Sequence, residues 1–193
     1  TVVRDLQSLS RPSEAGDSLL DPVEILERCL DITGHQFVRR ARVERVFAPI
    51  PIVRGDEGRM VQVFVNLLLN AAQAIPEGAA DRHRVRVIAR TAADGRALLE
   101  VSDDGAGIPD DVIGRIFDPF FTTKKLGEGT GLGLWIARGI VAEMGGAIEV
   151  ESAADRGTTF RVLLPAAAPP SPARSRELPR IAPGPELVAR PAH

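Results

Sequence analysis

The order of hydrophobic and polar positions along the chain predicts helices alternating with short strands. Asp21-Pro22 is typical of a helix start, because aspartate caps free amides and proline fits the first helical position. Asp56 likewise precedes a long apolar segment that reaches about Ile75, next to Pro76. Short apolar or β-branched segments predict strands, and these lie within 41–54, 85–90, 97–102, 147–151 and 158–164.

Further turns and helices complete this pattern. Asp94-Gly95 predicts a hairpin turn between two strands. A short helix is expected over 110–116, and a longer one over 132–144, ended by Gly145-Gly146. These elements predict an α+β fold, a two-layer α/β sandwich with helices on one face of a mixed, mainly antiparallel sheet.

The two ends of the chain differ from this central part. Residues 1–10 carry apolar side chains at helical spacing and Pro12 ends the pattern, so residues 1–16 are expected to be the end of a helix with partners elsewhere. From Ala166 the chain is rich in Pro, Ala and Arg without periodicity, which predicts a disordered tail or linker over 166–193. The folded domain is expected at 22–165.

Composition narrows the function classes. A net charge of -2 gives no basic field for nucleic acid, and 44% hydrophobic with 26% charged residues is ordinary for a globular protein. Cys29 is the only cysteine, so no internal disulfide forms. No apolar run reaches the roughly 20 residues that a membrane helix needs. We expect a cytoplasmic domain, with membrane attachment through an upstream segment left open.

Two asparagines lie on one face of the helix predicted after Asp56. Asn66 and Asn70 are four residues apart, in a helix that is otherwise apolar almost all round. Buried amides need hydrogen-bond partners. Either both bond to nearby backbone or water, or their face lines a ligand or metal site.

Three glycine-containing segments and one aromatic segment are further candidates. Asp103–Ile108 follows a strand and is either a turn or a place where backbone approaches a planar ligand. Gly127–Leu134 precedes a helix and is either a flexible linker or an anion site, without the Rossmann or Walker spacing. Phe117–Lys125 combines aromatic residues, hydroxyls and two lysines, and Gly157–Phe160 enters the last strand.

In this order and spacing the segments resemble the catalytic domain of sensor histidine kinases. That domain belongs to an ATPase superfamily shared with gyrase, the mismatch-repair ATPase and a heat-shock chaperone, with a Bergerat-type fold. The motifs correspond to an N box, a first glycine box, an F box, and a second and third glycine box, which are Asn66–Ala71, Asp103–Ile108, Phe117–Lys124, Gly129–Leu134 and Gly157–Phe160. The Phe-Phe-Thr-Thr-Lys-Lys segment is most similar to nitrogen-regulation kinases.

The resemblance implies ATP and Mg²⁺ as ligands. Asn70 would bind the metal, and Asp103 would accept a hydrogen bond from the adenine amino group, with Gly105 and Gly107 giving the base room. Thr159 would support that carboxylate, and residues 122–131 would form a lid. The implied cofactor-binding residues are Asn66, Asn70, Gln73, Asp103, Gly105, Gly107, Ile108, Phe120, Thr122, Thr123, Lys124, Lys125, Gly129, Thr130, Gly131, Leu132, Gly133, Leu134 and Thr159.

Three positions depart from related patterns. Asn66 stands where hydrolytic relatives place a glutamate base, and an amide cannot take a proton from water, so Asn66 is the catalytic position expected to favour a kinase over an ATPase. Gln73 stands where many members have a basic residue, so one phosphate contact is missing or Lys124 supplies it. Asp104 replaces a common asparagine, with little effect expected.

The implied function is transfer of the ATP γ-phosphoryl group to a histidine on a dimerisation domain. None of His35, His83 and His193 lies in an acceptor context, so the acceptor is expected outside this chain. The implied partners are that dimerisation and phosphoacceptor domain, a response regulator receiver domain and a second copy in a homodimer. The alternatives are an ATPase of the gyrase or chaperone class, a serine kinase that binds a sigma factor, and a nucleotide-binding module without kinase activity.

Overall fold

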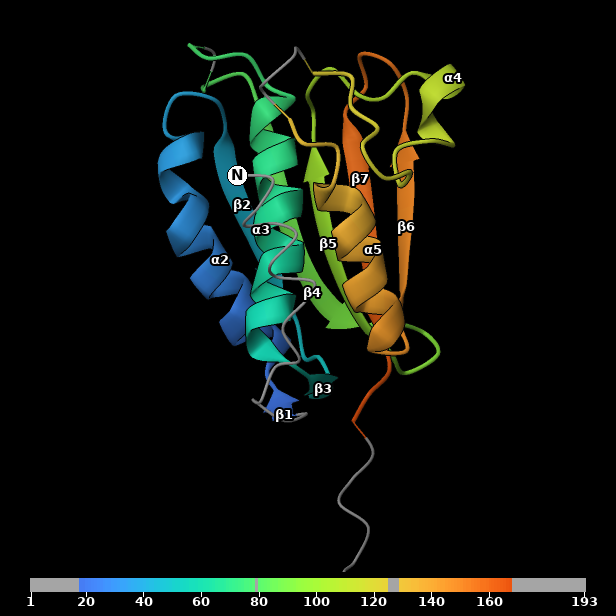
Figure 1. Ribbon diagram of the computed structural model, residues 1–193. Coiled ribbons are helices and arrows are strands. Elements are labelled where there is room, and N and C mark those ends of the chain that lie inside the picture. The colour runs from blue at the N-terminus through green and yellow to red at the C-terminus, as the bar shows by residue number, and fades with distance from the viewer. Residues whose placement is uncertain (1–17, 79, 125–128, 168–193) are drawn as a thin grey trace, which may run out of the picture.

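The computed structural model describes residues 18–78, 80–124 and 129–167, which form two layers (Figure 1). Three helices, α2 (Pro22–Phe37), α3 (Glu57–Gln73) and α5 (Gly133–Glu143), cover one face of a five-stranded sheet. The predicted α+β sandwich with a mixed sheet is confirmed. The helix expected within residues 1–16, and the tail beyond Ala167, lie outside the described residues.

The sheet has the strand order β2-β4-β5-β7-β6. Its strands are β2 (Arg42–Phe47), β4 (Arg84–Thr91), β5 (Ala97–Asp103), β6 (Ala147–Ser152) and β7 (Thr158–Leu164). β2 and β4 are parallel, whereas every other pair is antiparallel. The one parallel pair brings α3 across the sheet, because parallel neighbours need a crossover connection.

A second sheet, of two strands, lies at one end of the domain. β1 (Ser18–Leu20) pairs antiparallel with β3 (Val53–Gly55), and Val53 also forms a bridge with Ala166. The sequence pattern did not predict β1, which is only three residues long. Its pairing joins the segment before α2 to the segment before α3.

Aspartate side chains cap the N-termini of the two long helices at the positions that the sequence predicts. The Asp21 carboxylate accepts from the Val23 amide at 2.8 Å, and the Asp56 carboxylate accepts from the Arg59 amide at 2.8 Å. α3 then packs in the centre of the core, and the side chains of Phe64 and Leu68 are fully buried. Burying such side chains is the main favourable term for the fold.

Two predicted turns are present. Gly95 has a φ of 84° in the hairpin between β4 and β5, and Gly145 has a φ of 71° after α5. The Gly146 amide donates to the Val141 carbonyl at 2.9 Å, which satisfies a free carbonyl at the end of α5. Cys29 is buried, and burial raises its thiol pKa to about 11, as expected for a structural cysteine.

The short helix before the F box ends earlier than predicted. α4 spans Asp110–Ile113 rather than 110–116. The amides of Arg115 and Asp118 donate three residues back, to Val112 and Arg115. Such bonds form tight successive turns instead of a continued α-helix.

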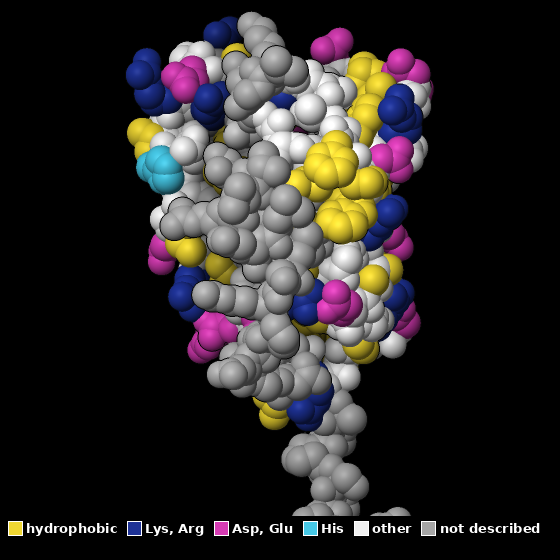
Figure 2. All heavy atoms as spheres, in the orientation of Figure 1, with side chains coloured by type: hydrophobic (Ala, Val, Ile, Leu, Met, Phe, Trp, Pro, Cys, Tyr) yellow, Lys and Arg dark blue, Asp and Glu magenta, His cyan; other side chains and the backbone are white. Residues whose placement is uncertain are grey.

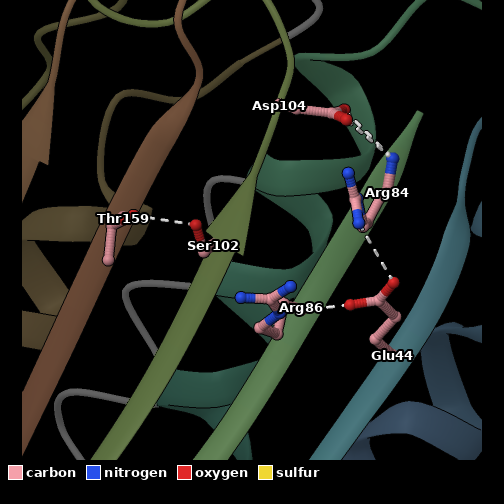
Figure 3. A network of polar contacts seen from close by, with 6 residues as sticks. All are labelled: Glu44, Arg84, Arg86, Ser102, Asp104 and Thr159. Atoms are coloured by element: carbon pink, nitrogen blue, oxygen red, sulfur yellow. Dashed lines mark hydrogen bonds and ion pairs between the residues drawn. The ribbon is translucent and has the colours of Figure 1, made fainter. Parts of the chain in front are cut away.

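Buried and exposed side chains alternate along the strands, so the sheet has one face covered by helices and one open face. In β4, Val85, Val87 and Ala89 are buried, whereas Arg84 and Arg86 are exposed. The outward arginines pair with Glu44 of β2 (Figure 3). Across the part of the chain that the structure describes, no helix is both long and apolar enough to cross a membrane.

Candidate nucleotide-binding site

The predicted site residues that the structure describes lie toward one end of the two layers, opposite the small β1–β3 sheet. β5 ends at Asp103, β7 begins at Thr158, and α5 begins at Gly133. The C-terminal half of α3, with Asn66 and Asn70, reaches the same end (Figure 1). The fold therefore gathers segments that lie up to about ninety residues apart in sequence, since residues 66 and 158 share this end.

Asp103 is a buried carboxylate at the C-terminal end of β5. Its side chain is only 9% exposed, and it accepts hydrogen bonds from the amides of Gly105, at 2.9 Å, and of Thr158. Desolvation by burial raises the pKa of Asp103 to about 6, against the two hydrogen bonds and with a smaller contribution from the charge of Asp104. A partner that donates a hydrogen bond to this carboxylate would stabilise its charged form.

The glycines after Asp103 are required by the packing of the protein itself. A Cβ atom on Gly105 would lie 2.5 Å from the Ala74 carbonyl oxygen, and one on Gly107 would lie 2.0 Å from that of Ala153. Gly107 also has a φ of 68°, which side chains rarely adopt. The sequence suggested that these glycines make room for a ligand, and the structure adds a second reason for them.

The predicted support of Asp103 by Thr159 is wrong. The strand register places Thr158 opposite Asp103 and Thr159 opposite Ser102. Successive side chains point to opposite faces of a strand, so Thr159 lies on the open face, where its hydroxyl bonds that of Ser102 at 2.8 Å (Figure 3). Thr158, which is buried, is the threonine next to the carboxylate.

Asp104 stabilises the neighbouring strand start. Its carboxylate accepts from the Arg84 amide at 3.0 and 3.1 Å and lies 3.0 Å from Nδ1 of His83 (Figure 3 shows the Arg84 contact). The side chain therefore holds the loop before β4 to the end of β5. His83 is engaged in this contact, and His35 lies in the last turn of α2.

The two asparagines of α3 both contact segments far along the chain. Nδ2 of Asn66 donates to the carbonyl of Gly133, 67 residues away, at 3.2 Å. Oδ1 of Asn70 accepts from Nζ of Lys124, 54 residues away, at 3.0 Å. Asn66 thus joins α3 to the first turn of α5, whereas Asn70 presents its amide oxygen to a cation.

Lys124 bridges the F box and α3. Besides Asn70, its ammonium group donates to Oε1 of Gln73. Partial desolvation lowers the pKa of Lys124. The structure therefore places a positive charge beside position 73, where the resemblance implies that a basic residue is common.

The second glycine box packs against the F box. Gly131 has a φ of 67°, and a Cβ atom there would lie 2.4 Å from the Phe120 backbone. The Leu132 amide donates to the Thr130 hydroxyl at 3.3 Å, and the Lys124 amide donates to the Thr122 hydroxyl at 3.2 Å. Lys125 and the predicted lid residues 126–128 lie outside the described residues.

Aromatic side chains of the F box lie beside the second glycine box. Phe120 is 67% exposed, whereas Phe117 and Phe121 pack partly against the core. Figure 2 shows hydrophobic side chains at the surface near the N-terminal end of α5. Arg115 lies over the ring of Phe121 at 4.7 Å from its centre, and Arg138 lies over Phe117 at 5.2 Å.

The other described site residues lie close to these contacts. Thr123 is exposed beside Lys124, Leu134 is packed against the core in α5, and the Ile108 amide donates to the Ser152 hydroxyl at 2.8 Å. A separate depression of about 400 Å³ lies at the opposite end of α5, bordered by Arg54, Arg59 and Glu143. None of the predicted site residues borders it.

A family match covers the same part of the chain. Residues 55–168 match the family described as histidine kinase-, DNA gyrase B-, and HSP90-like ATPase. This range runs from Gly55, the last residue of β3, past the end of β7 and includes all five motifs. The chain belongs to this family.

Similar curated proteins are sensor kinases. The chain is 39% identical over 181 residues to the sensor kinase CckA of Brucella abortus, covering 86% of this chain and 19% of the relative. It is 39% identical over 153 residues to the sensory histidine kinase/phosphatase NtrB of Azospirillum brasilense, covering 73% and 37%. The predicted resemblance to histidine kinases, including the nitrogen-regulation type, is confirmed, and the chain spans less than half of these relatives.

Solved structures show the same architecture. The mycobacterial sensor histidine kinase MprB aligns with a TM-score of 0.66 at 30% identity, over 77% of this chain and 97% of that one. Full-length ShkA in complex with AMPPNP aligns with a TM-score of 0.65 at 27% identity, over 86% of this chain and 35% of that one. The fold is that of histidine kinase catalytic domains.

Proposed function

We propose that this chain is the ATP-binding catalytic domain of a two-component sensor histidine kinase. It would transfer the γ-phosphoryl group of ATP to a histidine on a dimerisation domain. The observation that carries the proposal is the buried Asp103 carboxylate, held at the same end of the fold as Asn70 and the glycine turn before α5. One end of the fold thus offers an acceptor for a base and donors for phosphates.

Adenine recognition falls to Asp103. A carboxylate held by the amides of Gly105 and Thr158 keeps a fixed direction, so it accepts the adenine amino group without reorienting. The neighbouring loop is fixed by the Ala106 amide, which donates to the Ala74 carbonyl at 3.0 Å. A charged acceptor in a partly dry site makes a stronger hydrogen bond than a neutral one.

Phosphate binding falls to the turn before α5, to Lys124 and to Asn70. Free amides at a helix start favour anions, and the ammonium group of Lys124 adds a charge where Gln73 has none. Asn70 fits Mg²⁺, because its amide oxygen is a hard ligand and already accepts from a cationic group. Bound Mg²⁺ would neutralise charge on the phosphates.

Asn66 favours transfer over hydrolysis. Its amide donates to the Gly133 carbonyl and offers no base to an attacking water. The γ-phosphoryl group is then kept for an imidazole acceptor. The corresponding partners are a dimerisation and phosphoacceptor domain, a response regulator receiver domain and a second copy of the kinase.

The test is phosphoryl transfer from γ-labelled Mg-ATP, with the chain alone and with a histidine kinase dimerisation domain added. We expect the chain alone to bind Mg-ATP without labelling itself, and the added domain to acquire acid-labile phosphate. Acid-stable label would support the serine kinase alternative. Rapid phosphate release without label would support the ATPase alternative. Acid-labile label on His35 would contradict the domain assignment.

A further inference from the structure

Ser152, the last residue of β6, lies at the centre of a hydrogen-bond cluster that joins two of the glycine boxes. Its hydroxyl donates to the Gly157 carbonyl at 2.8 Å and accepts from the Ile108 amide at 2.8 Å. The Thr158 hydroxyl lies 3.0 Å away. Since the single proton of Ser152 goes to Gly157, Thr158 donates and Ser152 accepts.

This cluster fixes the loop that follows Asp103. The first glycine box and the β6–β7 turn are in close contact, because the Asp155 amide donates to the Ala106 carbonyl at 2.7 Å. A Cβ atom on Gly157 would lie 1.9 Å from the Asp103 carbonyl oxygen, which leaves no space between the two segments. Ser152 holds the far end of the loop, at Ile108, while Asp103 holds its beginning through Gly105.

The strand register makes Ser152 part of the same row as Asp103. Ser152 is paired with Thr158 across β6 and β7, and Thr158 is paired with Asp103 across β7 and β5. The next row, which ends in Ser102, points to the open face and contains a hydroxyl pair of its own, Ser102 and Thr159. The molecule therefore carries two serine–threonine pairs at adjacent positions, and the pair with Ser152 is the one that bonds the backbone of both the first and the third glycine box.

We propose that Ser152 is a positioning residue for adenine, acting through the loop from Asp103 to Ile108. This rests on the proposed function of the site. Replacing the hydroxyl removes the partner of the Ile108 amide, the Gly157 carbonyl and the Thr158 hydroxyl together. The end of the loop at Ile108 is then no longer held at a fixed distance from Asp103. The pocket for the adenine base loses its shape.

The test compares ATP and GTP affinity by calorimetric titration in four proteins: the parent, Ser152→Ala, Ser152→Thr and the control Ser102→Ala. We expect Ser152→Ala to weaken ATP binding by roughly tenfold, as for a lost hydrogen bond. GTP, which lacks the adenine amino group, should bind weakly and equally to the parent and to Ser152→Ala. Ser152→Thr keeps the hydroxyl and should restore most of the affinity, and Ser102→Ala should match the parent.

Two results would overturn the proposal. One is an unchanged ATP affinity in Ser152→Ala, and the other is an equal loss of ATP and GTP affinity, which indicates general destabilisation. If Ser152→Ala does not fold, Ser152→Cys replaces it, since a thiol keeps the volume but bonds weakly. A parent that binds no ATP contradicts the proposed function itself, whereas a parent that binds ATP with no response to Ser152 contradicts only this inference.

Discussion

The base side and the phosphate side of the candidate site are built differently. On the base side, Asp103 is buried, its carboxylate is held by two backbone amides, and glycines pack against backbone on both flanks. On the phosphate side, Thr122, Thr123 and Lys124 are exposed. The Thr122 hydroxyl accepts from the Lys124 amide, and the Lys124 ammonium group donates to side-chain oxygens of α3. The first region is set by strands and the second by a loop.

This difference indicates how binding energy is divided between the two sides. A preformed acceptor needs no reordering when the base arrives, so its hydrogen bond contributes fully to affinity. On the phosphate side, Lys124 contacts the Asn70 oxygen that we assign to the metal. A metal ion there must replace this ammonium group, so the phosphate side has to rearrange. The following changes test that contrast.

Asn70→Ala should have the largest effect, because it removes the assigned metal ligand on the phosphate side. We expect magnesium-dependent nucleotide binding to fall about a hundredfold or more, while the fold is kept, since alanine favours helix over asparagine. Thermal melts with and without Mg-ATP measure this. Gln73→Ala, which removes the other Lys124 contact, is the matched control and should keep the magnesium-dependent shift. The same shift in Asn70→Ala would refute the metal assignment.

Asp103→Ala should be next, because it removes a charge-assisted hydrogen bond on the base side. We expect ATP affinity to fall by about ten- to a hundredfold in calorimetric titration. Asp104→Asn is the control, since it changes the adjacent carboxylate, which contacts Arg84 rather than the site. An equal loss of ATP affinity in both variants would show that binding depends on the negative charge of this region and not on a hydrogen-bond acceptor at Asp103.

The pH dependence of ATP affinity should separate the two sides further. Burial raises the pKa of Asp103 from 3.8 to about 6, so the free domain takes up a proton as pH falls through about 6. Because the proposed adenine contact needs the charged carboxylate, ATP affinity should fall by about tenfold between pH 7 and pH 5. An Asp103→Asn variant should lose this dependence. A parent whose affinity stays flat over that range would place the base elsewhere.

The raised pKa of Asp103 gives the stability of the free domain a pH dependence opposite in direction to that of ATP affinity. The folded state holds its proton up to about pH 6, and the unfolded state loses it near 3.8. Between these values the folded state binds more protons, so stability rises as pH falls. At neutral pH the charged, buried carboxylate destabilises the free domain by about 1–3 kcal/mol. Asp103→Asn should therefore raise the melting temperature at pH 7 and lose that advantage near pH 4.

Gln73→Lys should have the smallest effect, although it adds a charge to the phosphate side. Lys124 already places an ammonium group beside position 73, and exposed charge pairs contribute little. We expect ATP affinity to rise by about two- to fivefold at low salt, and by less at high salt. Titration at two salt concentrations measures this. A gain above tenfold would mean that Lys124 does not replace the missing basic residue.

Motif order and hydrophobic pattern were sufficient to predict many of the helices, strands and turns of this molecule. The caps at Asp21 and Asp56, the hairpin at Asp94-Gly95 and the helix end at Gly145 depend on nearby residues, and each is where the sequence predicts. Pattern alone missed β1, because three residues carry no period, and their pairing with β3 is a contact across more than thirty residues.

Only the tertiary structure decided which threonine stands beside Asp103. The motif at 157–160 contains two adjacent threonines, and adjacent residues in a strand face opposite ways. The register between β5 and β7 turns Thr158 to the covered face and Thr159 to the open face. A local pattern cannot specify that register, because it depends on how a partner strand far along the chain is aligned.

The same holds for the partners of the site residues. The spacing of four between Asn66 and Asn70 determined that they share a helix face, since helical geometry is local. That Asn66 meets Gly133 and Asn70 meets Lys124 was decided by packing of α3 against α5 and the F box. Local residue order thus determined the elements and motifs, whereas long-range packing, in which backbone and side chains must fit without overlap, determined which of their groups face one another.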